Sequence, residues 1–548
     1  MPDTGAKSES SRGAHEASYD AVIVGGGFAG LYMLHKLRGL GFSARVYEAG
    51  DGIGGTWFWN RYPGARVDIQ SLEYSYQFDE DLQQQWEWSE RYAPQAELLT
   101  YANHVADRFK LWPDIQLNTR VTGAQFDEKT DTWRVTTDKG DAVSANHLVM
   151  ATGCLSSTNT PDFEGLGSFK GRTFHTGSWP KEPVDFTGRR VGIIGTGSSA
   201  IQSIPLIAKQ AKHLTVLQRT PNYSVPAHNG PIPEEVVKDV KSRYAGYRAA
   251  NNNTALGADW DYRTDNAMDA TPQERLAEYE SRWARGGLSF YGSYVDILSD
   301  PQANETAAEF IRGKIRQIVK DPAVAAKLLP TAALACKRIC VDTGYYDTYN
   351  RPNVTLVDVR AAPIEAVTPT GLRTADASYE FDDLIFATGF DAMTGALTRM
   401  DIKGVGGVGL KDAWAEGPKT YLGLQVAGFP NLFIIAGPGS PSVLTNMLPS
   451  IEQHVNWIGQ TLDYLRKKGL GRIEASPEAQ EAWVAHVNEI AAPTILPTCN
   501  SWYLGANIPG KPRVFMPYLG FAPYVEKCND VVAKGYEGFA LTPAAKAS

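Results

Sequence analysis

The chain has 548 residues, enough for roughly three domains if each takes about 150 residues. Its 53 basic and 61 acidic residues give a formal net charge of −8. This charge argues against a nucleic-acid partner, because such partners usually need a basic patch, and no apolar run approaches the roughly 18 residues of a membrane span.

Residues 1–18 are polar, Ser-rich and of mixed charge, without the apolar core of a signal peptide, and we expect a disordered tail. The five cysteines are an odd number without framework spacing, which predicts reduced thiols in a cytoplasmic protein. They are Cys154, Cys336, Cys340, Cys499 and Cys528. Cys336 and Cys340 have no His nearby, so no metal site is expected.

A first Gly-rich turn follows the apolar run 19–24, which is typical of a buried parallel strand. The turn opens a helical pattern over residues 31–40, and a second strand, 44–47, ends in an acid about 20 residues on. The glycines allow a tight turn, close backbone approach to a pyrophosphate, and helix packing, while the acid accepts hydrogen bonds from ribose hydroxyls. The predicted cofactor-binding residues here are Gly25, Gly27, Phe28, Gly30 and Glu48.

The first domain should continue as an antiparallel ribbon, 120–121 with 133–137, with a turn at 138–140. A strand at 147–150 then leads into Ala151-Thr152-Gly153, a turn of small residues that lets the backbone approach a cofactor.

A second Gly-rich turn follows the strand 190–194 and precedes a helix at 201–208. The next strand, 214–218, ends in Arg219 where an acid would favour an unphosphorylated ribose. A cation suits a 2′-phosphate, so this site should prefer NADPH to NADH. Its predicted binding residues are Gly195, Thr196, Gly197, Ser198, Ser199, Arg219 and Thr220.

The remaining elements complete an α/β fold of two Rossmann-like dinucleotide-binding domains with a helical insertion in the second. Strands are expected at 353–357, 381–386 and 432–436, and a helix at 451–468. The expected domains are 19–153 with 387–548, 154–230 with 331–386, and the insertion 231–330, which is too long for a structureless loop.

Between the two Gly-rich turns lies a pattern of four residues, Phe169, Gly171, His175 and Trp179, followed by Pro. It resembles the fingerprint of the flavin-dependent Baeyer–Villiger monooxygenases. The segments 52–57, 60–68, 336–346 and 501–507 also resemble that family, and the resemblance covers residues 19 to 540. It is nearest to the branch of phenylacetone and steroid monooxygenases, judged by residues 437–444 and the region of Trp502.

The resemblance implies that FAD occupies the first site and NADPH the second. It places Gly55, Thr56, Trp57, Asp68, Tyr74, Val121 and Met447 at the flavin, and Lys337 at the NADP phosphate. It makes Arg338 the active-site arginine, held by Asp68, and Trp502 a residue that closes over the site. His175 would couple the domains and not act as a general base. Cys340 stands where close relatives would have Pro.

The reaction implied uses NADPH and O₂ to form an FAD C4a-peroxide that attacks a ketone and gives an ester or lactone, with sulfoxidation as a side activity. Two alternatives stay open. A heteroatom (N or S) oxygenase is disfavoured by Trp179, and the lack of Cys-x-x-Cys argues against a thiol reductase within the class of non-oxygenating NADPH flavin reductases. The ketone (aromatic, cyclic or linear) and the oligomeric state, a monomer included, are left open.

Overall fold

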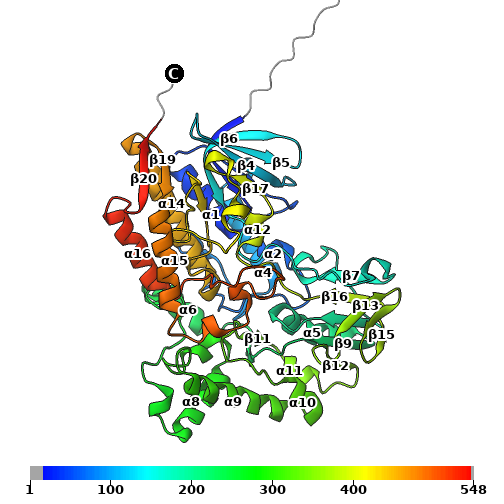
Figure 1. Ribbon diagram of the computed structural model, residues 1–548. Helices are drawn as coiled ribbons and strands as arrows, with labels where there is room; N and C mark the ends of the chain where they lie inside the picture. The colour runs from blue at the N-terminus through cyan, green and yellow to red at the C-terminus, as the bar shows by residue number, and fades with distance from the viewer. Residues whose placement is uncertain (1–16, 545–548) are drawn as a thin grey trace, which may run out of the picture.

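The computed structural model describes residues 17–544. The predicted tail lies outside this range except for Ala17 and Ser18, which begin the first strand, β1. Two sheets form the body of the molecule, with the helical insertion below them and the C-terminal helices along one side (Figure 1).

The first sheet has eight strands and is built mainly from the N-terminal part of the chain. Its order is β17 (Asp401–Lys403), β4 (Val121–Asp127), β5 (Thr132–Thr137), β6 (Ala142–Met150), β1 (Ala17–Val24), β2 (Ala44–Tyr47) and β3 (Ile115–Gln116), with β18 (Leu432–Ile434) also paired to β6. The central strands β1, β2, β6 and β18 run parallel. Their apolar runs are buried, as expected for parallel strands covered on both faces.

The expected antiparallel ribbon is present but larger than the sequence predicted. Strand β4 pairs antiparallel with β5, and β5 pairs antiparallel with β6. The predicted turn at 138–140 therefore joins β5 to β6.

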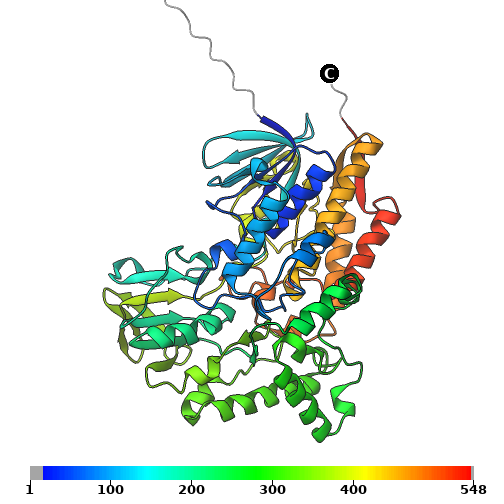
Figure 2. The same cartoon turned by 180° about the vertical axis from the view of Figure 1, so that it is seen from behind.

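Within residues 17–544, nine helices pack around the first sheet or against one another beside it. They are α1 (Phe28–Gly39), α2 (Thr56–Trp59), α3 (Glu80–Gln85), α4 (Gln95–Arg108), α12 (Gly395–Thr398), α13 (Leu410–Ala413), α14 (Met447–Lys468), α15 (Pro477–Ala491) and α16 (Phe521–Ala533). Helix α14 lies beside α1, and Figure 2 shows this pairing from behind. Helix α14 begins at Met447, four residues before the predicted start, because Asn446 caps it through Leu448 N–H. The ribbon β19 (Leu470–Ala475) and β20 (Phe539–Pro543) follows along the same side.

The second sheet is entirely parallel, with the order β12 (Val354–Asp358), β9 (His213–Gln218), β8 (Arg190–Ile194), β16 (Asp383–Phe386) and β7 (Arg172–His175). The fingerprint, which looks like a loop in the sequence, thus supplies the edge strand β7. The buried carboxylate of Asp383 fixes this edge: its Oδ1 lies 2.6 Å from Arg172 Nε and 2.8 Å from Arg189 Nη2. A small antiparallel sheet of β13 (Ile364–Thr368), β14 (Gly371–Thr374) and β15 (Ser378–Glu380) packs nearby.

The insertion folds into α6 (Glu234–Ser242), α7 (Tyr244–Asn252), α8 (Pro272–Arg285), α9 (Pro301–Ile318) and α10 (Pro322–Leu328). Two short parallel strands, β10 (Ser224–Pro226) and β11 (Cys340–Asp342), join where the insertion leaves and re-enters the second domain. The short helix α11 (Tyr345–Thr348) follows β11.

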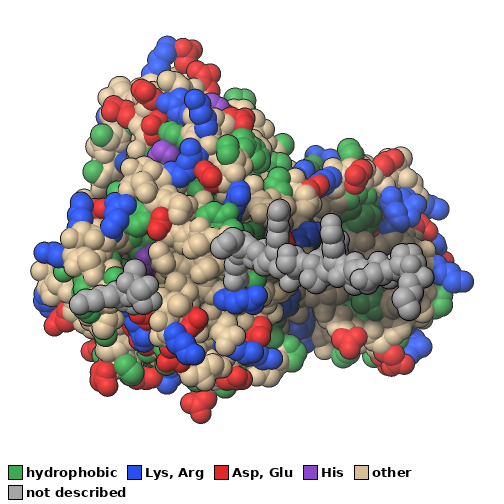
Figure 3. All heavy atoms as spheres, turned by 90° about the horizontal axis from the view of Figure 1, so that it is seen from above, with side chains coloured by type: hydrophobic (Ala, Val, Ile, Leu, Met, Phe, Trp, Pro, Cys, Tyr) green, Lys and Arg blue, Asp and Glu red, His purple; other side chains and the backbone are tan. Residues whose placement is uncertain are grey.

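Basic and acidic side chains are interspersed over the face seen from above (Figure 3). Among the helices of residues 17–544, none is both long enough and apolar enough to cross a membrane.

Candidate active site

The two Gly-rich turns are built in the same way. Gly25 has φ +108°, and a Cβ there would lie 2.6 Å from the Ala151 carbonyl oxygen. Gly195 has φ +111°, and a Cβ there would lie 2.4 Å from the Ala387 carbonyl oxygen. Each turn is therefore pressed against an Ala-Thr-Gly turn that follows a neighbouring strand, where only glycine fits. This close backbone packing leaves each helix N-terminus free to meet a pyrophosphate.

The surroundings of the first turn suit an adenine dinucleotide. Both oxygens of Glu48 accept one backbone N–H, from Gly26 and Gly50, each at 2.7 Å. A carboxylate oxygen can accept further hydrogen bonds, so Glu48 retains capacity for a ribose hydroxyl. A Cβ on Gly55 would lie 2.9 Å from Gly27 Cα, so the segment 52–57 lies directly against the turn.

The other residues predicted at the flavin are distributed around this turn. Phe28 begins α1 and packs edge-on against Tyr74 and Tyr76. Trp57 Nε1 donates to the Tyr74 hydroxyl at 3.3 Å, while Thr56 is exposed at the start of α2. Val121 is buried in β4. Met447 is the first residue of α14, directly after Asn446, whose Nδ2 donates to the Glu73 carbonyl oxygen at 3.0 Å.

The second turn is surrounded by side-chain hydroxyls. Helix α5 (Ser198–Gln210) begins after Gly197, and Ser199 Oγ lies 3.0 Å from Thr176 Oγ1, next to the fingerprint. Thr196 Oγ1 donates to the Thr220 carbonyl oxygen at 2.9 Å.

Arg219 and Lys337 come from distant parts of the chain but influence each other. Burial lowers the pKa of Lys337, and the charge of Arg219 lowers it further. Within the described part of the chain neither cation has an ion-pair partner. Two neighbouring cations without a counter-charge fit a nucleotide 2′-phosphate, which would relieve their repulsion.

Arg338 and Asp68 form a two-point ion pair across 270 positions of sequence. Arg338 Nε donates to Asp68 Oδ2 at 2.6 Å, and Nη2 donates to Oδ1 at 3.2 Å. Nη1 donates to the Val443 carbonyl oxygen at 3.2 Å, so the loop 437–444 also holds the guanidinium. Burial alone would lower the pKa of Arg338, but the charge and hydrogen bonds of Asp68 outweigh burial and raise it. The guanidinium is therefore permanently charged and fixed in direction.

The fingerprint connects the two sheets. Burial lowers the pKa of His175, and its Nδ1 accepts the Gly177 N–H at 2.9 Å, so the ring is a neutral structural element. Its Nε2 lies 3.4 Å from both the Asn159 carbonyl and Thr388 Oγ1. Trp179 N–H donates to the Trp59 carbonyl in α2 at 3.1 Å. Phe169 and Gly171 lie at the other end, where a Cβ on Gly171 would meet the Phe169 ring.

The structure corrects the prediction that all five cysteines are reduced. Cys336 and Cys499 form a disulfide that joins the segment before Arg338 to the segment before Trp502. The other three cysteines are free and buried. The prediction was wrong because a pair 163 residues apart has no local spacing that sequence patterns could reveal.

Cys340 has a clear structural role in place of the expected Pro. Its N–H donates to the Tyr223 carbonyl oxygen at 3.0 Å in the pairing of β10 with β11, which a Pro could not do. Trp502 is half-buried and packs on Tyr503 with ring centroids 4.3 Å apart.

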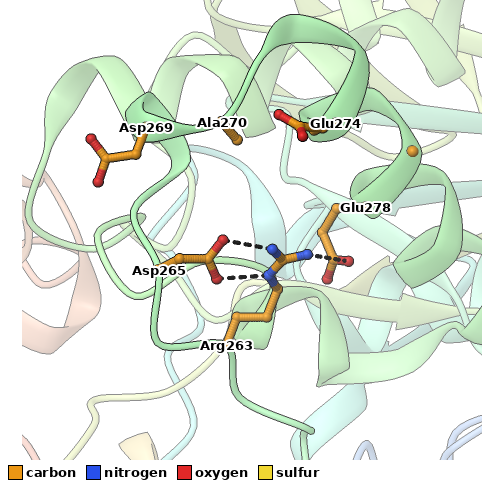
Figure 4. A pocket seen from close by; sticks show the side chains of 7 residues that line it. Arg263, Asp265, Asp269, Ala270, Glu274 and Glu278 are labelled. Atoms are coloured by element: carbon orange, nitrogen blue, oxygen red, sulfur yellow. Dashed lines mark hydrogen bonds and ion pairs between the residues drawn. The ribbon is translucent and has the colours of Figure 1, made fainter.

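A hollow of about 490 Å³ in the insertion contains none of the predicted site residues. It is lined by Arg263, Asp265, Asp269, Ala270, Glu274, Ala277 and Glu278. Figure 4 shows Arg263 between Asp265 and Glu278, at 2.6 and 3.2 Å, so its charge is already balanced.

Comparison with known proteins supports the arrangement. The model of the pyridine nucleotide-disulphide oxidoreductase family matches residues 22–253. A Baeyer-Villiger monooxygenase of Pseudooceanicola batsensis is 45% identical over 95% of this chain and 96% of its own. Phenazine N-monooxygenase PhzNO1 of Lysobacter antibioticus is 42% identical (95% and 97%), and cyclohexanone 1,2-monooxygenase of Acinetobacter sp. is 41% identical (96% and 97%).

Solved structures agree over the same length. Oxidized steroid monooxygenase bound to NADP is 50% identical with a TM-score of 0.92, covering 96% of this chain and 100% of that one. The OTEMO complex with FAD and NADP is 40% identical with a TM-score of 0.93, covering 96% and 99%. Identity of this extent over the whole fold shows that the chain belongs to the Baeyer–Villiger monooxygenase family.

Proposed function

We propose that the protein is an NADPH- and O₂-dependent flavin monooxygenase that inserts one oxygen atom beside a ketone carbonyl to give an ester or lactone. The observation that carries this proposal is the Arg338–Asp68 ion pair, which joins the stretch after the first nucleotide site to the loop beside the second. Relatives named for cyclohexanone support the ketone as substrate class.

The residues around the first turn would hold FAD and those around the second NADPH. Gly25, Gly27 and Gly30 would admit the FAD pyrophosphate, and Glu48 would bind the ribose. Arg219 and Lys337 would bind the 2′-phosphate of NADPH. The reduced flavin supplies the oxygen-activating chemistry when bound.

Arg338 would act on the reacting oxygen atoms. Asp68 and the Val443 carbonyl occupy some of its donors and set its direction, which leaves other N–H groups for an oxygen anion or a carbonyl oxygen. A preorganised cation stabilises developing negative charge without reorganising at the moment of reaction. His175, which is neutral and bonded within the fingerprint, would keep the two domains in register and move no proton.

Nitrogen oxidation is a second candidate because one relative is named a phenazine N-monooxygenase. It is not favoured, since the relative named a Baeyer-Villiger monooxygenase is more similar, at 45% identity against 42%, and relatives named for cyclohexanone and acetone match equally well. Amines offered beside ketones would reveal it as an N-oxide product.

Replacing Arg338 with Ala tests the proposal. Arg338→Ala should keep NADPH oxidation and lose ester formation by about a hundredfold to a thousandfold, the range seen when a key electrostatic group is removed. The control is Arg316→Ala, which removes an exposed ion pair with Glu309 in the insertion. Both products, ester and hydrogen peroxide, should be quantified against NADPH consumed; ester formation that survives in Arg338→Ala would refute the assigned role.

A further inference from the structure

The helical insertion contacts the backbone of the arginine segment through one side chain. The Tyr291 hydroxyl oxygen accepts the N–H of Ile339, the residue after Arg338, at 2.7 Å. Ile339 is 1% exposed, so this amide has no access to water as an alternative partner. Buried backbone N–H groups are costly when left without an acceptor, so the contact constrains the segment.

A pair of glycines directs Tyr291 to this position. Tyr291 lies in the short helix η5 (Gly287–Gly292), which begins at the pair Gly286 and Gly287, whose φ angles are +74° and +69°. A Cβ on Gly286 would lie 2.4 Å from the Pro226 carbonyl, and one on Gly287 would lie 1.9 Å from the Tyr92 hydroxyl. Only glycine fits at either point, so the turn is pressed against β10 and against the stretch that precedes α4.

The Tyr291 ring is also held in place, by packing contacts. It packs against Trp260 with centroids 5.7 Å apart, and it is half-buried against the main core. Burial raises its pKa, so the phenol stays neutral at physiological pH. A neutral phenol oxygen can accept the Ile339 N–H and still donate its own proton.

We propose that Tyr291 is a positioning residue for Arg338, so that the helical insertion forms part of the catalytic apparatus. The side chain of Arg338 is fixed at its guanidinium by Asp68 and the Val443 carbonyl, and Tyr291 fixes the backbone from which that side chain extends. Three separate segments thus determine where the cation lies, and a small displacement at a preorganised site has a large effect on rate. The inference rests on the proposed function of Arg338.

The test compares Tyr291→Phe with Tyr294→Phe. Tyr291→Phe keeps the ring and removes the acceptor of the Ile339 N–H. Tyr294 lies three residues further on, is equally part of the insertion, and has a buried hydroxyl without a hydrogen-bond partner among the described residues. Its replacement therefore loses a hydroxyl from the same region without touching the arginine segment.

Tyr291→Phe should lower kcat for ester formation about tenfold, the effect of one lost hydrogen bond. It should leave KM for NADPH unchanged and raise the share of NADPH that ends as hydrogen peroxide. Tyr294→Phe should match the wild type in kcat, in KM for NADPH and in the share of NADPH that ends as hydrogen peroxide. Equal behaviour of the two variants, or a rise in KM for NADPH without a fall in kcat, would overturn the proposal.

A second readout does not depend on catalysis. Hydrogen exchange of the peptide containing Ile339, followed by mass spectrometry on the FAD-bound protein, should be faster in Tyr291→Phe and unchanged in Tyr294→Phe. Unchanged exchange in both variants would contradict the inference whatever the activity. If the wild type forms no ester but the Ile339 peptide still exchanges faster in Tyr291→Phe than in the wild type, the proposed function is refuted while the contact is established.

If Tyr291→Phe does not fold, 3-fluorotyrosine at position 291 provides the same test. Fluorine withdraws electrons from the phenol oxygen and weakens it as an acceptor while the ring still packs on Trp260. A smaller loss of kcat in the same direction supports the inference, and wild-type kinetics and exchange would overturn it.

Discussion

At the scale of single residues, two cations without an ion-pair partner among the described residues support the proposed preference for NADPH. Arg219 and Lys337 repel each other, and burial of Lys337 makes the repulsion costly. At the edge of the second sheet, by contrast, Arg172 and Arg189 are balanced by the carboxylate of Asp383. The two unpaired cations therefore suggest an anionic ligand, and the end of β9 is where a ribose phosphate would lie.

Arg219→Ala should raise KM for NADPH by about tenfold to a hundredfold, the value of one charge-assisted hydrogen bond, and change KM for NADH little. Steady-state kinetics with both nucleotides checks this. Arg243→Ala is the matched control, because Arg243 is an exposed arginine already paired with Asp239. Equal rises in the two KM values would show that Arg219 does not contact the 2′-phosphate.

Which site residues could be predicted from the sequence depended on how far apart in the chain the interacting residues lie. The glycines, Glu48 and Arg219 could be proposed as binding residues from local patterns, because each lies within a turn or at a strand end. The pairing of Arg338 with Asp68, 270 residues apart, followed only from family resemblance. Tyr291 and the Val443 carbonyl gave no signal, since a lone Tyr in a helical segment and a backbone oxygen look the same in any sequence.

At the scale of elements, the segments that carry the predicted site residues pair with segments distant in the sequence. The fingerprint became the edge strand β7 because Arg172 and its backbone pair with β16, which arrives some two hundred residues later in the chain. The strand, helix and turn order of both nucleotide domains was predictable from hydrophobic periodicity and Gly-rich turns. The course of the insertion was predictable only as helical, because its packing depends on long-range contacts.

The disulfide is the element-scale feature that most needs testing. Thiol titration of the denatured, unreduced protein should find the three thiols of Cys154, Cys340 and Cys528, and prior reduction should raise the count to five. Because the bridge closes a loop of 163 residues, replacing both of its cysteines with Ser should lower the free energy of unfolding by about 2–5 kcal/mol. Five thiols without reduction would show that the segments before Arg338 and Trp502 are not linked.

At the scale of the whole molecule, buried titratable groups oppose each other in their effect on stability. Burial raises the pKa of Glu73 and Glu452 to about 7, so their contribution to stability is complete below pH 4.5 and is lost as pH rises through 7. Burial lowers the pKa of His147 to about 4 and of His454 to about 3, so stability is lost as pH falls below 6.5. The two effects offset each other in the window between 4.5 and 6.5.

Glu452→Gln should isolate the pH dependence that Glu452 contributes, because the buried histidines are present in both proteins. The Gln oxygen can still accept the N–H groups of Gln77 and Phe78, which Glu452 Oε1 accepts at 2.7 and 3.1 Å. The stability of the wild type relative to this variant should fall with rising pH, by up to about 1.4 kcal/mol per pH unit. Urea unfolding of the FAD-bound proteins at three pH values between 4.5 and 6.5 measures this difference in the free energy of unfolding. A difference that does not change with pH would contradict the raised pKa of Glu452.

The central claim is that this chain transfers one atom of O₂ to a ketone at the expense of NADPH. The most direct measurement is mass spectrometry of the products formed under ¹⁸O₂ from a panel of aromatic, cyclic and linear ketones, with NADPH consumption followed in parallel. The account predicts an ester or lactone that carries one ¹⁸O atom for each NADPH used with at least one ketone. NADPH consumption that yields only hydrogen peroxide with every ketone, or an ester without ¹⁸O, would contradict it.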